Sequence, residues 1–309
     1  MIKNPEIAVV LPVYNAQNFL KEAIDSVLQQ TLKNFELIII NDGSTDSSES
    51  IVLGYKDHRI RYIKQENTGI GGALRIGCEL AKGKYIARMD ADDICLPNRF
   101  ELQKKYLDNN PNTVLVSNAV IYINESGNII GRSFPYTSSF AIKKKLKYGS
   151  PICHPSVMMR KTAYELAGGY IDLELLEDLH LWIKLSKHGD FYNISSPLLK
   201  YRILSNSISR SITISQFNLL INFLNNMHND SHEMKSNIVE FNKMYLLAKK
   251  ENKSLLNRDS ITSTSNEAIL SSKTEHKLYK VLTSLKLSET RIQFIMCNLK
   301  NMFTYIQNK

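Results

Sequence analysis

The chain has 309 residues, 43% of them hydrophobic, and a formal net charge of +9 from 39 basic and 30 acidic residues. This size predicts a globular protein with one main core and room for a smaller extension. The basic residues form no arginine-rich tract with interleaved aromatic residues, so we expect phosphate-bearing ligands or anionic lipid as partners, and no nucleic acid.

Cysteine and hydropathy patterns predict a cytoplasmic protein. The cysteines lack the C-x-x-C spacing of a zinc site or a disulfide framework. They are Cys78, Cys95, Cys153 and Cys297. The sequence contains no run of about 18 apolar residues and no secretory signal at its N-terminus, so neither a membrane span nor secretion is expected.

The first third of the chain predicts a parallel sheet built from strand–helix–strand units. Apolar residues at helical spacing over residues 19–28 and 70–81 predict helices that pack on the sheet. Short apolar runs predict at least four strands, at residues 7–11, 35–40, 59–64 and 85–89.

Polar and acidic side chains follow three of these strands. Residues 12–15 follow the first strand, Asp42 ends the second, and Asp90, Asp92 and Asp93 follow the fourth. In open α/β sheets, ligands bind beyond the carboxyl ends of the strands. The sequence therefore predicts one polar binding edge.

The acidic turn after the fourth strand predicts a metal site. Asp90, Asp92 and Asp93 would repel one another unless a cation or several donors offset their charge. Mg²⁺ and Mn²⁺ suit such oxygen ligands and fill their remaining positions with water and phosphate. The alternative is that Asp92 or Asp93 caps a helix beginning at Pro97. Metal binding is favoured for Asp92, and both interpretations are open for Asp93.

These motifs, in this order over residues 5–210, resemble glycosyltransferase family 2. The matching segments are residues 10–15, 40–46, 66–69, 89–93, 154–160, 168–170 and 177–178, with Trp182 one helical turn later. The resemblance implies a GT-A fold, an α/β class with a Rossmann-like, mostly parallel sheet flanked by helices. It also implies metal-dependent, inverting transfer of a sugar from a nucleotide-sugar, usually a UDP-sugar, to a saccharide hydroxyl.

The resemblance implies a donor site at the polar edge. Asp42 would accept a hydrogen bond from the uracil N3–H and Tyr14 would flank the ring, although an Asx turn and a partly exposed aromatic remain the alternatives. Asp92 would hold Mn²⁺ or Mg²⁺, which offsets charge on the departing diphosphate. The expected nucleotide-binding residues are Pro12, Val13, Tyr14, Asn15, Asp42, Gly69 and Asp90.

The resemblance also implies an acceptor site. Asp178 would be the base that deprotonates the acceptor hydroxyl, or simply an acid in the first turn of a helix. Glu177 and His154 would lie beside the acceptor, and the histidine is equally consistent with a structural role. Trp182 would wall the pocket, but core packing is favoured for it.

One position departs from the family pattern. Many relatives carry a metal-binding or pyrophosphate-binding histidine where this chain has Leu204. A further metal ligand from the protein is therefore in doubt, and the nearby Arg202 is either a diphosphate partner or a surface arginine.

We expect a catalytic domain at residues 1–210 and a helical extension at 211–309. The nucleotide-sugar half would span about residues 1–95 and the acceptor half about 96–210. Helices are predicted at 216–227 and 238–250, a loop at 260–266, and a basic amphipathic helix from Lys273. That helix would lie on anionic lipid, on the catalytic domain or on a second subunit.

If relatives are a guide, the acceptor is a lipid-linked oligosaccharide, which favours peripheral contact of the C-terminal helices with the inner face of a bacterial plasma membrane. A separate cluster, Lys143, Lys144, Lys145 and Lys147, is interpreted as a solvated helix face.

Other functions fit the sequence less well. A nucleotidyltransferase or sugar-nucleotide synthase would carry a glycine-rich basic loop after the first strand, which is absent. A non-catalytic relative would have lost Asp92 or Asp178, and both are present. A dinucleotide dehydrogenase is excluded because no G-x-G-x-x-G follows the first strand.

Overall fold

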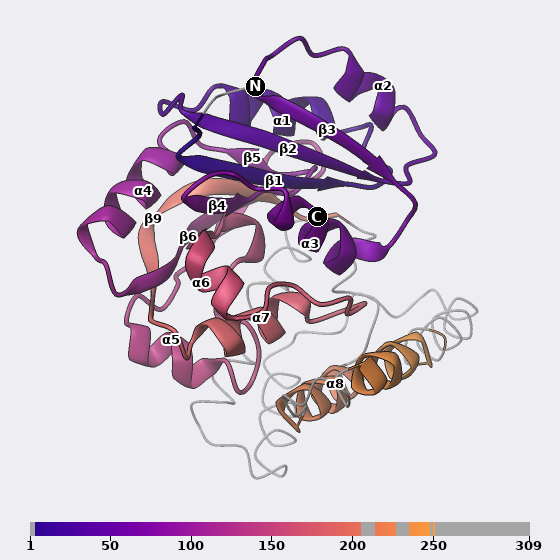
Figure 1. Cartoon of the computed structure of the whole chain (residues 1–309), viewed down its shortest axis with the longest axis vertical. Helices are drawn as coiled ribbons and strands as arrows, with labels where there is room; N and C mark the ends of the chain where they lie inside the picture. Colours follow the sequence, from indigo (N-terminus) through magenta and orange to yellow (C-terminus); the bar gives the residue numbers. More distant parts are fainter. Residues whose placement is uncertain (1–3, 205–213, 227–234, 248–249, 251–309) are drawn as a thin grey trace. The chain divides into compact units, whose positions relative to one another are not determined.

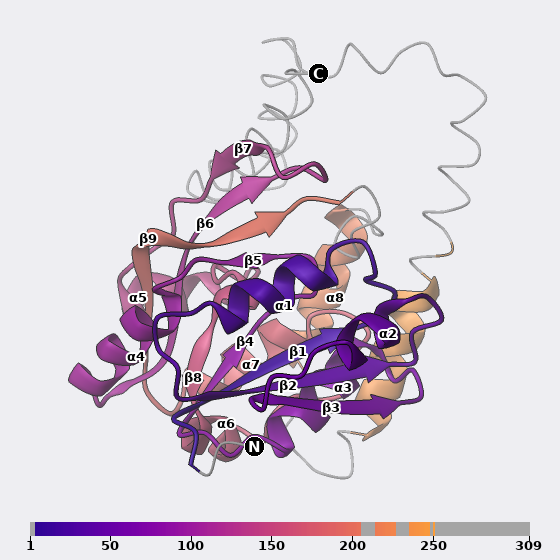
Figure 2. The ribbon, with the colours of Figure 1, turned by 90° about the horizontal axis from the view of Figure 1, so that it is seen from above.

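The computed structural model describes residues 4–204, 214–226, 235–247 and 250. A nine-stranded sheet forms its centre. The strands are β1 (Ile7–Val13), β2 (Phe35–Asp42), β3 (Ile60–Gln65), β4 (Tyr85–Arg88), β5 (Ile94–Cys95), β6 (Thr113–Ile123), β7 (Ile129–Arg132), β8 (Met158–Arg160) and β9 (Asp190–Arg202). Their order is β3-β2-β1-β4-β8-β6-β9-β5, and β7 pairs with β6 at the edge (Figure 2).

Helices cover both faces of the sheet. They are α1 (Leu20–Leu28), α2 (Ser48–Leu53), α3 (Gly69–Glu79), α4 (Arg99–Asn109), α5 (Ser139–Lys145), α6 (Lys161–Leu166), α7 (Glu177–Leu185) and α8 (Ile214–Asn226), with one 3₁₀ turn, η1 (His154–Ser156). None of the helices among the described residues is long and apolar enough to cross a membrane.

The parallel half of the sheet confirms the four predicted strands. β1 pairs in parallel with β2 and β4, and β2 with β3. α1 and α2 lie on one side of β1 to β3 and α3 lies on the other (Figure 1). Because both faces are covered, β1 and β2 read as continuous apolar runs instead of alternating ones.

Close packing of α3 against the sheet depends on a glycine. A Cβ added at Gly77 would lie 2.4 Å from Cγ1 of Val10 on β1. A side chain at this position would push the helix away from the strand. Gly77 therefore lets the second half of α3 pack closely on β1.

The second half of the sheet is mixed. β8 runs antiparallel to both β4 and β6, β9 runs parallel to β6, and the short β5 runs antiparallel to β9. His154, expected beside the acceptor or as a structural histidine, lies in the 3₁₀ turn His154–Ser156, and β8 begins at Met158.

The helices predicted at 216–227 and 238–250 are present, at α8 and at residues 235–247. Their buried residues join the core cluster that also contains the apolar faces of α3 and α7. These residues are Leu220, Ile221, Leu224, Phe241 and Tyr245. The loop at 260–266 and the basic helix from Lys273 lie outside the described residues, and the domain boundary at residue 210 stays a prediction.

Candidate active site

The strand order reverses direction between β1 and β4. The chain goes from β1 to β2 and β3 on one side, and β4 lies on the other side of β1. β1 extends three residues beyond Val10, the last residue that pairs with β4. Such a reversal in an open α/β sheet leaves a crevice beyond the strand ends. The residues after β1, β2 and β4 lie at this edge.

The acidic turn after β4 brings three carboxylates together. One oxygen each of Asp90, Asp92 and Asp93 lie within 4.8 Å of one another. Burial, and after it the charge of Asp90, raises the pKa of Asp92 to about 6. The same causes raise the pKa of Asp93 well above its usual value. A cation at this turn would relieve the repulsion that these shifts reflect.

Asp93 also has a structural partner in β9. Its Oδ1 accepts a hydrogen bond of 2.8 Å from the backbone N–H of Arg202, and its Oδ2 is buried without a donor among the described residues. α4 begins at Arg99 after the N-cap residue Asn98. The helix expected from Pro97 therefore starts two residues later, and neither Asp92 nor Asp93 caps it.

Arg202 is not a surface arginine. Its side chain is buried, and its Nε donates to the carbonyl oxygen of Asp92 at 2.8 Å. Its other nitrogens bind the carboxylate of Glu22 and the carbonyl oxygens of Asn124 and Glu125. The Arg202 guanidinium therefore holds the acidic turn through these contacts.

A buried arginine lies at the base of the acidic turn. Nη1 of Arg88 is 2.6 Å from Oδ2 of Asp90, and the side chain is 3% exposed. Burial disfavours the charged form, but Asp90 more than offsets this and the pKa of Arg88 stays above its usual value. Nη1 is held by Asp90, whereas Nε has no hydrogen-bond acceptor among the described residues. A buried donor without an acceptor is costly unless a ligand uses it.

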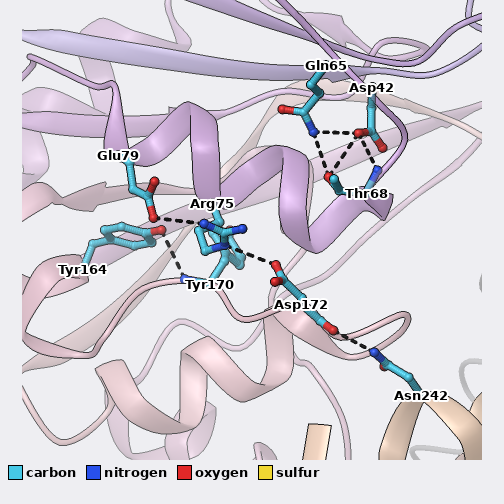
Figure 3. Close-up of polar contacts among 9 residues, drawn as sticks. All are labelled: Asp42, Gln65, Thr68, Arg75, Glu79, Tyr164, Tyr170, Asp172 and Asn242. Carbon is cyan, nitrogen blue, oxygen red and sulfur yellow. Dashed lines mark hydrogen bonds and ion pairs between the residues drawn. The ribbon is translucent and has the colours of Figure 1, made fainter. Parts of the chain in front are cut away.

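Asp42 is held by the start of α3. Its Oδ1 accepts hydrogen bonds from the Gln65 side chain at 2.7 Å and from the backbone N–H and hydroxyl of Thr68 at 2.9 and 3.1 Å (Figure 3). Its Oδ2 receives no hydrogen bond within the described part of the chain. Asp42 is therefore fixed by its protein neighbours, with one oxygen left to accept a donor from a ligand.

The remaining predicted nucleotide-binding residues lie around this corner. Tyr14 is 56% exposed, although aromatic side chains are usually more buried. Asn15 has a positive φ of 50°, and its side-chain oxygen accepts the N–H of Thr45 at 2.8 Å. Pro12 and Val13 belong to β1, and Gly69 begins α3 with φ 78° and open space at its Cβ position. All of these residues lie on the carboxyl edge.

The predicted acceptor residues form a separate, more buried group. Nε2 of His154 lies 2.8 Å from the Tyr170 hydroxyl, and Nδ1 lies 3.5 Å from Oε1 of Glu177. Burial, and after it the Arg88 charge, holds the pKa of His154 well below its usual value. Burial, and after it Asp178, raises the pKa of Glu177 to about 8. The contact between His154 and Glu177 therefore joins two neutral groups at pH 7.

Trp182 lies behind this histidine. The two rings meet edge to face with centroids 5.6 Å apart, and Trp182 has no exposed surface. This position matches the core packing favoured for the only tryptophan. Trp182 can therefore affect an acceptor only through His154.

Asp178 lies at the start of α7. Burial raises its pKa, and the N–H of Leu179 and the Ser150 hydroxyl oppose that shift. The N–H of Leu179 lies 2.7 Å from Oδ1. Leu176, the N-cap residue before α7, has a left-handed backbone with φ 65°, which is strained for a leucine. Such strain is often found where a side chain must be presented in a fixed direction.

The loop before α7 is anchored from two sides. Asp172 binds Arg75 of α3 at 3.2 Å, and its carbonyl oxygen accepts the side chain of Asn242 at 2.8 Å (Figure 3). Asn242 also accepts the N–H of Glu174 at 2.9 Å. These contacts hold the segment that carries Glu177 and Asp178.

Sequence reasoning missed Arg88, Tyr170, Ser150 and Leu176. Arg88 had a signal, because an arginine in a buried strand directly before three aspartates must be paired. Its charge acts on Asp92 of the donor group and on His154 and Glu177 of the acceptor group. Arg88 therefore lies close to both groups, and the structure brings them to one region.

The acidic turn is the only group of three or more potential metal ligands found in the described ranges. Asp92 and Asp90 are the accessible members, because Asp93 is buried and bound to β9. One or two carboxylates with open positions for water and phosphate suit Mg²⁺ or Mn²⁺. The residues present thus fit a divalent metal.

Comparison with known proteins agrees with this site. Residues 8–166 match the family model described as "Glycosyl transferase family 2". The chain is 33% identical over 230 residues to EpsE of Bacillus subtilis (strain 168), which is named as a glycosyltransferase; the match covers 72% of this chain and 82% of EpsE. It is 35% identical over 204 residues to an uncharacterized glycosyltransferase of Rickettsia bellii (strain RML369-C), covering 66% of this chain but only 29% of that protein.

A solved structure supports the fold. S. aureus TarS 1-349 in complex with UDP-GlcNAc matches with a TM-score of 0.59 and 16% identity, covering 89% of this chain and 80% of that one. At this identity the likeness shows the fold alone, which is GT-A, as the sequence predicted. Together with the family match over residues 8–166, these findings show that the chain is a glycosyltransferase that belongs to glycosyltransferase family 2.

Proposed function

We propose that this chain transfers a sugar, with inversion, from a UDP-sugar to a hydroxyl of a lipid-linked saccharide, with a divalent metal at the acidic turn. The observation that carries the proposal is the cluster of Asp90, Asp92 and Asp93 at the carboxyl edge, next to a second carboxylate pair at the start of α7. The acidic turn suits a metal that binds a diphosphate, and the pair at the start of α7 suits an acceptor hydroxyl.

The donor corner supports a uracil nucleotide. Oδ1 of Asp42 is occupied by Gln65 and Thr68, so Oδ2 is left to accept the N3–H of uracil. Tyr14 offers an exposed ring face for stacking on the base. The structural likeness to TarS, which was solved with UDP-GlcNAc, supports a UDP-sugar as the donor.

The acidic turn would hold Mn²⁺ or Mg²⁺ through Asp92, with Asp90 nearer the ribose. When bound, such a metal stabilises the negative charge that develops on the departing diphosphate. Arg202 keeps the turn in place, because it binds the Asp92 carbonyl oxygen and its backbone holds Asp93. Arg88 neutralises part of the charge of Asp90 before any ligand arrives.

Asp178 would remove the proton of the acceptor hydroxyl. A carboxylate is a weak base, and its strength increases as its pKa rises; burial raises the pKa of Asp178. Glu177 is protonated at neutral pH and next to neutral His154, so it supplies a hydrogen-bond donor for the acceptor or for Asp178. A single displacement with one base inverts the anomeric centre.

The test is calorimetry of UDP binding with Mn²⁺, with Mg²⁺ and with a chelator, followed by hydrolysis of a panel of nucleotide sugars. We expect UDP to bind tightly only with a metal, and UDP-sugars to be hydrolysed faster than GDP-sugars or dTDP-sugars. The absence of cation-assisted binding of any nucleoside diphosphate would overturn the proposed metal site. Faster hydrolysis of another nucleotide class would overturn the assignment of uracil.

A further inference from the structure

The segment from β7 to the end of α5 exposes an unusual set of side chains. Residues 126–150 contain five basic residues and no acidic residue. The same segment contains five large apolar or aromatic side chains that are 38–76% exposed. They are Ile129, Phe134, Tyr136, Phe140 and Tyr148. We call this segment the basic–aromatic surface.

Hydrogen bonds to the sheet hold the backbone that carries these exposed side chains. The N–H of Ser133 binds the carbonyl oxygen of Val120 on β6 at 2.9 Å, and the side chain of Asn193 on β9 binds the carbonyl oxygen of Tyr136 at 2.8 Å. The Ser139 hydroxyl binds Asp190 at 2.9 Å. The segment is therefore attached along β6 and β9, at the edge where β7 lies (Figure 2).

Phe134 and Phe140 are each 76% exposed, more than any other large hydrophobic side chain among the described residues. Exposed phenylalanine has no polar atom to compensate, so a pair of them favours a partner that buries apolar surface. The rings lie among cations. Arg132 is 4.4 Å from the centroid of Phe134, and Lys145 is 5.5 Å from that of Tyr136.

α5 and the residues just after it carry more positive charge than the helix dipole and the nearby Asp190 balance. Lys143, Lys144 and Lys145 occupy its last turn, where cations stabilise the helix dipole. Lys143 also lies 3.5 Å from Asp190, the acidic partner on β9. Lys144 and Lys147 are exposed and have no acidic partner within the described residues. The solvated helix face expected from the sequence therefore leaves at least two cations for an external anionic partner.

From this surface we infer that the segment at residues 129–148 docks the protein on an anionic lipid bilayer. Exposed aromatic side chains insert at the boundary between headgroups and acyl chains, and lysines on flexible stems bind the headgroups. The basic–aromatic surface offers both chemistries and no carboxylate within its own segment. It is distinct from the basic C-terminal segment, which lies outside the described residues.

The surface leads directly to the candidate base. Ser150, the last residue of this segment, lies close enough to Asp178 to oppose the rise of its pKa, and its hydroxyl donates to the carbonyl oxygen of Ile152 at 3.0 Å. A bilayer at residues 129–148 would thus bring a lipid-linked hydroxyl towards the start of α7. The preference for lipid over an acidic protein rests on the proposed function, in which the acceptor is lipid-linked.

The test is co-sedimentation of the full chain with phosphatidylcholine vesicles, with and without phosphatidylglycerol. We expect binding only to the anionic vesicles, weakened by salt. Lys144→Ala/Lys147→Ala should lower the partition coefficient about 25-fold, about fivefold for each lysine. Phe134→Ser/Phe140→Ser should lower it about 100-fold, about tenfold for each phenylalanine. Leu53→Ser/Leu166→Ser, which removes two apolar side chains exposed elsewhere, is the matched control and should bind normally.

Three outcomes would overturn this inference. They are no binding to anionic vesicles, equal binding to neutral vesicles, and unchanged binding by both double variants, which would place the contact elsewhere in the chain. All variants should hydrolyse the nucleotide-sugar donor in solution like the wild type. Because vesicle binding needs no turnover, its failure is distinguishable from failure of the proposed transfer reaction.

Discussion

The two carboxylate groups of this site are prepared in opposite ways. At the turn after β4, Asp90, Asp92 and Asp93 crowd together and face the cations of Arg88 and Arg202. At the start of α7, Glu177 is buried beside neutral His154 and Asp178 is half-buried, and no cation of the described residues forms an ion pair with either carboxyl group. The first group therefore has unmet negative charge, and the second holds a proton on Glu177.

This difference separates the two tasks of the reaction. Crowded carboxylates are relieved by a divalent cation, which suits binding of a diphosphate. Buried carboxyls with raised pKa values exchange protons near neutral pH, which suits acid–base work on a hydroxyl. Carboxyl groups in two different surroundings, both within reach of the Arg88 charge, thus take on two different roles.

The largest expected effect comes from a variant that removes the proposed acceptor base and leaves the donor site intact. Asp178→Asn should lower kcat for transfer by about 10²–10⁴-fold because the base is lost, while UDP affinity stays unchanged. Transfer assays and calorimetry on the same preparation measure both quantities. Glu165→Gln, an exposed carboxylate on α6, serves as the control and should be normal. Near-normal transfer by Asp178→Asn would assign the base to another group.

The next variant tests whether the acidic turn depends on the side chain of Arg202. Arg202→Met leaves three carbonyl oxygens without their buried donor, while the released Glu22 carboxylate is 55% exposed, so the free energy of unfolding should fall by about 1–3 kcal/mol. Arg202→Lys keeps the charge but not the planar fork, and should lose less. Urea denaturation measures both. A loss below about 1 kcal/mol would show that β9 and the turn hold together without this side chain.

A third variant tests the exposed donor ring. Tyr14→Ala should weaken UDP binding about 5- to 100-fold through lost stacking and leave Tm unchanged, because the ring is 56% exposed. Tyr14→Phe should bind normally. Leu53→Ala is the control, because Leu53 is 61% exposed on α2. Equal UDP affinities for Tyr14→Ala and the wild type would remove Tyr14 from the nucleotide site.

The smallest effect concerns the proton on Glu177. Its pKa is raised from 4.5 to about 8, so in this window the folded protein holds a proton that the unfolded chain has released. The free energy of unfolding therefore falls as pH rises towards about 8. Above that pH, Glu177 causes no further decrease. Between pH 7 and pH 8, Glu177→Gln should remove about 1 kcal/mol of this decline, or about 2–4 °C in Tm.

Thermal unfolding at the two pH values measures this difference, with Glu165→Gln as the exposed control. A decline in the variant as steep as in the wild type would mean that Glu177 is already ionised at pH 7. The contrast between a charged donor group and a protonated acceptor group would then be lost.

The parallel half of the fold was predictable because its strands are buried on both faces. Uniform burial gives unbroken apolar runs, which β1 and β2 show clearly. Their true ends, Val13 and Asp42, lie two residues beyond the predicted ends, because Pro12 on β1 and the polar Asn41 and Asp42 on β2 look like turn residues in sequence. The family resemblance then located the acidic turn and the start of α7 together.

The rest depended on contacts between distant residues. Arg202 resembled a surface arginine because no local pattern reveals that Glu22 lies beside it, 180 residues earlier. The contact between His154 and Tyr170 and the effect of Ser150 on the pKa of Asp178 also depend on the tertiary fold. Residues 129–148 gave no readable pattern, since their aromatic side chains follow neither strand nor helix periodicity.

The left-handed backbone at Leu176 ties acceptor preference to apolar packing. A leucine in this conformation costs about 1–3 kcal/mol, and its burial in the core offsets that cost. The direction in which Glu177 and Asp178 leave the loop is therefore set by how tightly Leu176 fits beneath them. Substitutions of the apolar residues that pack around Leu176 would therefore change the position of both carboxyl groups, and with it acceptor preference, without touching the sugar.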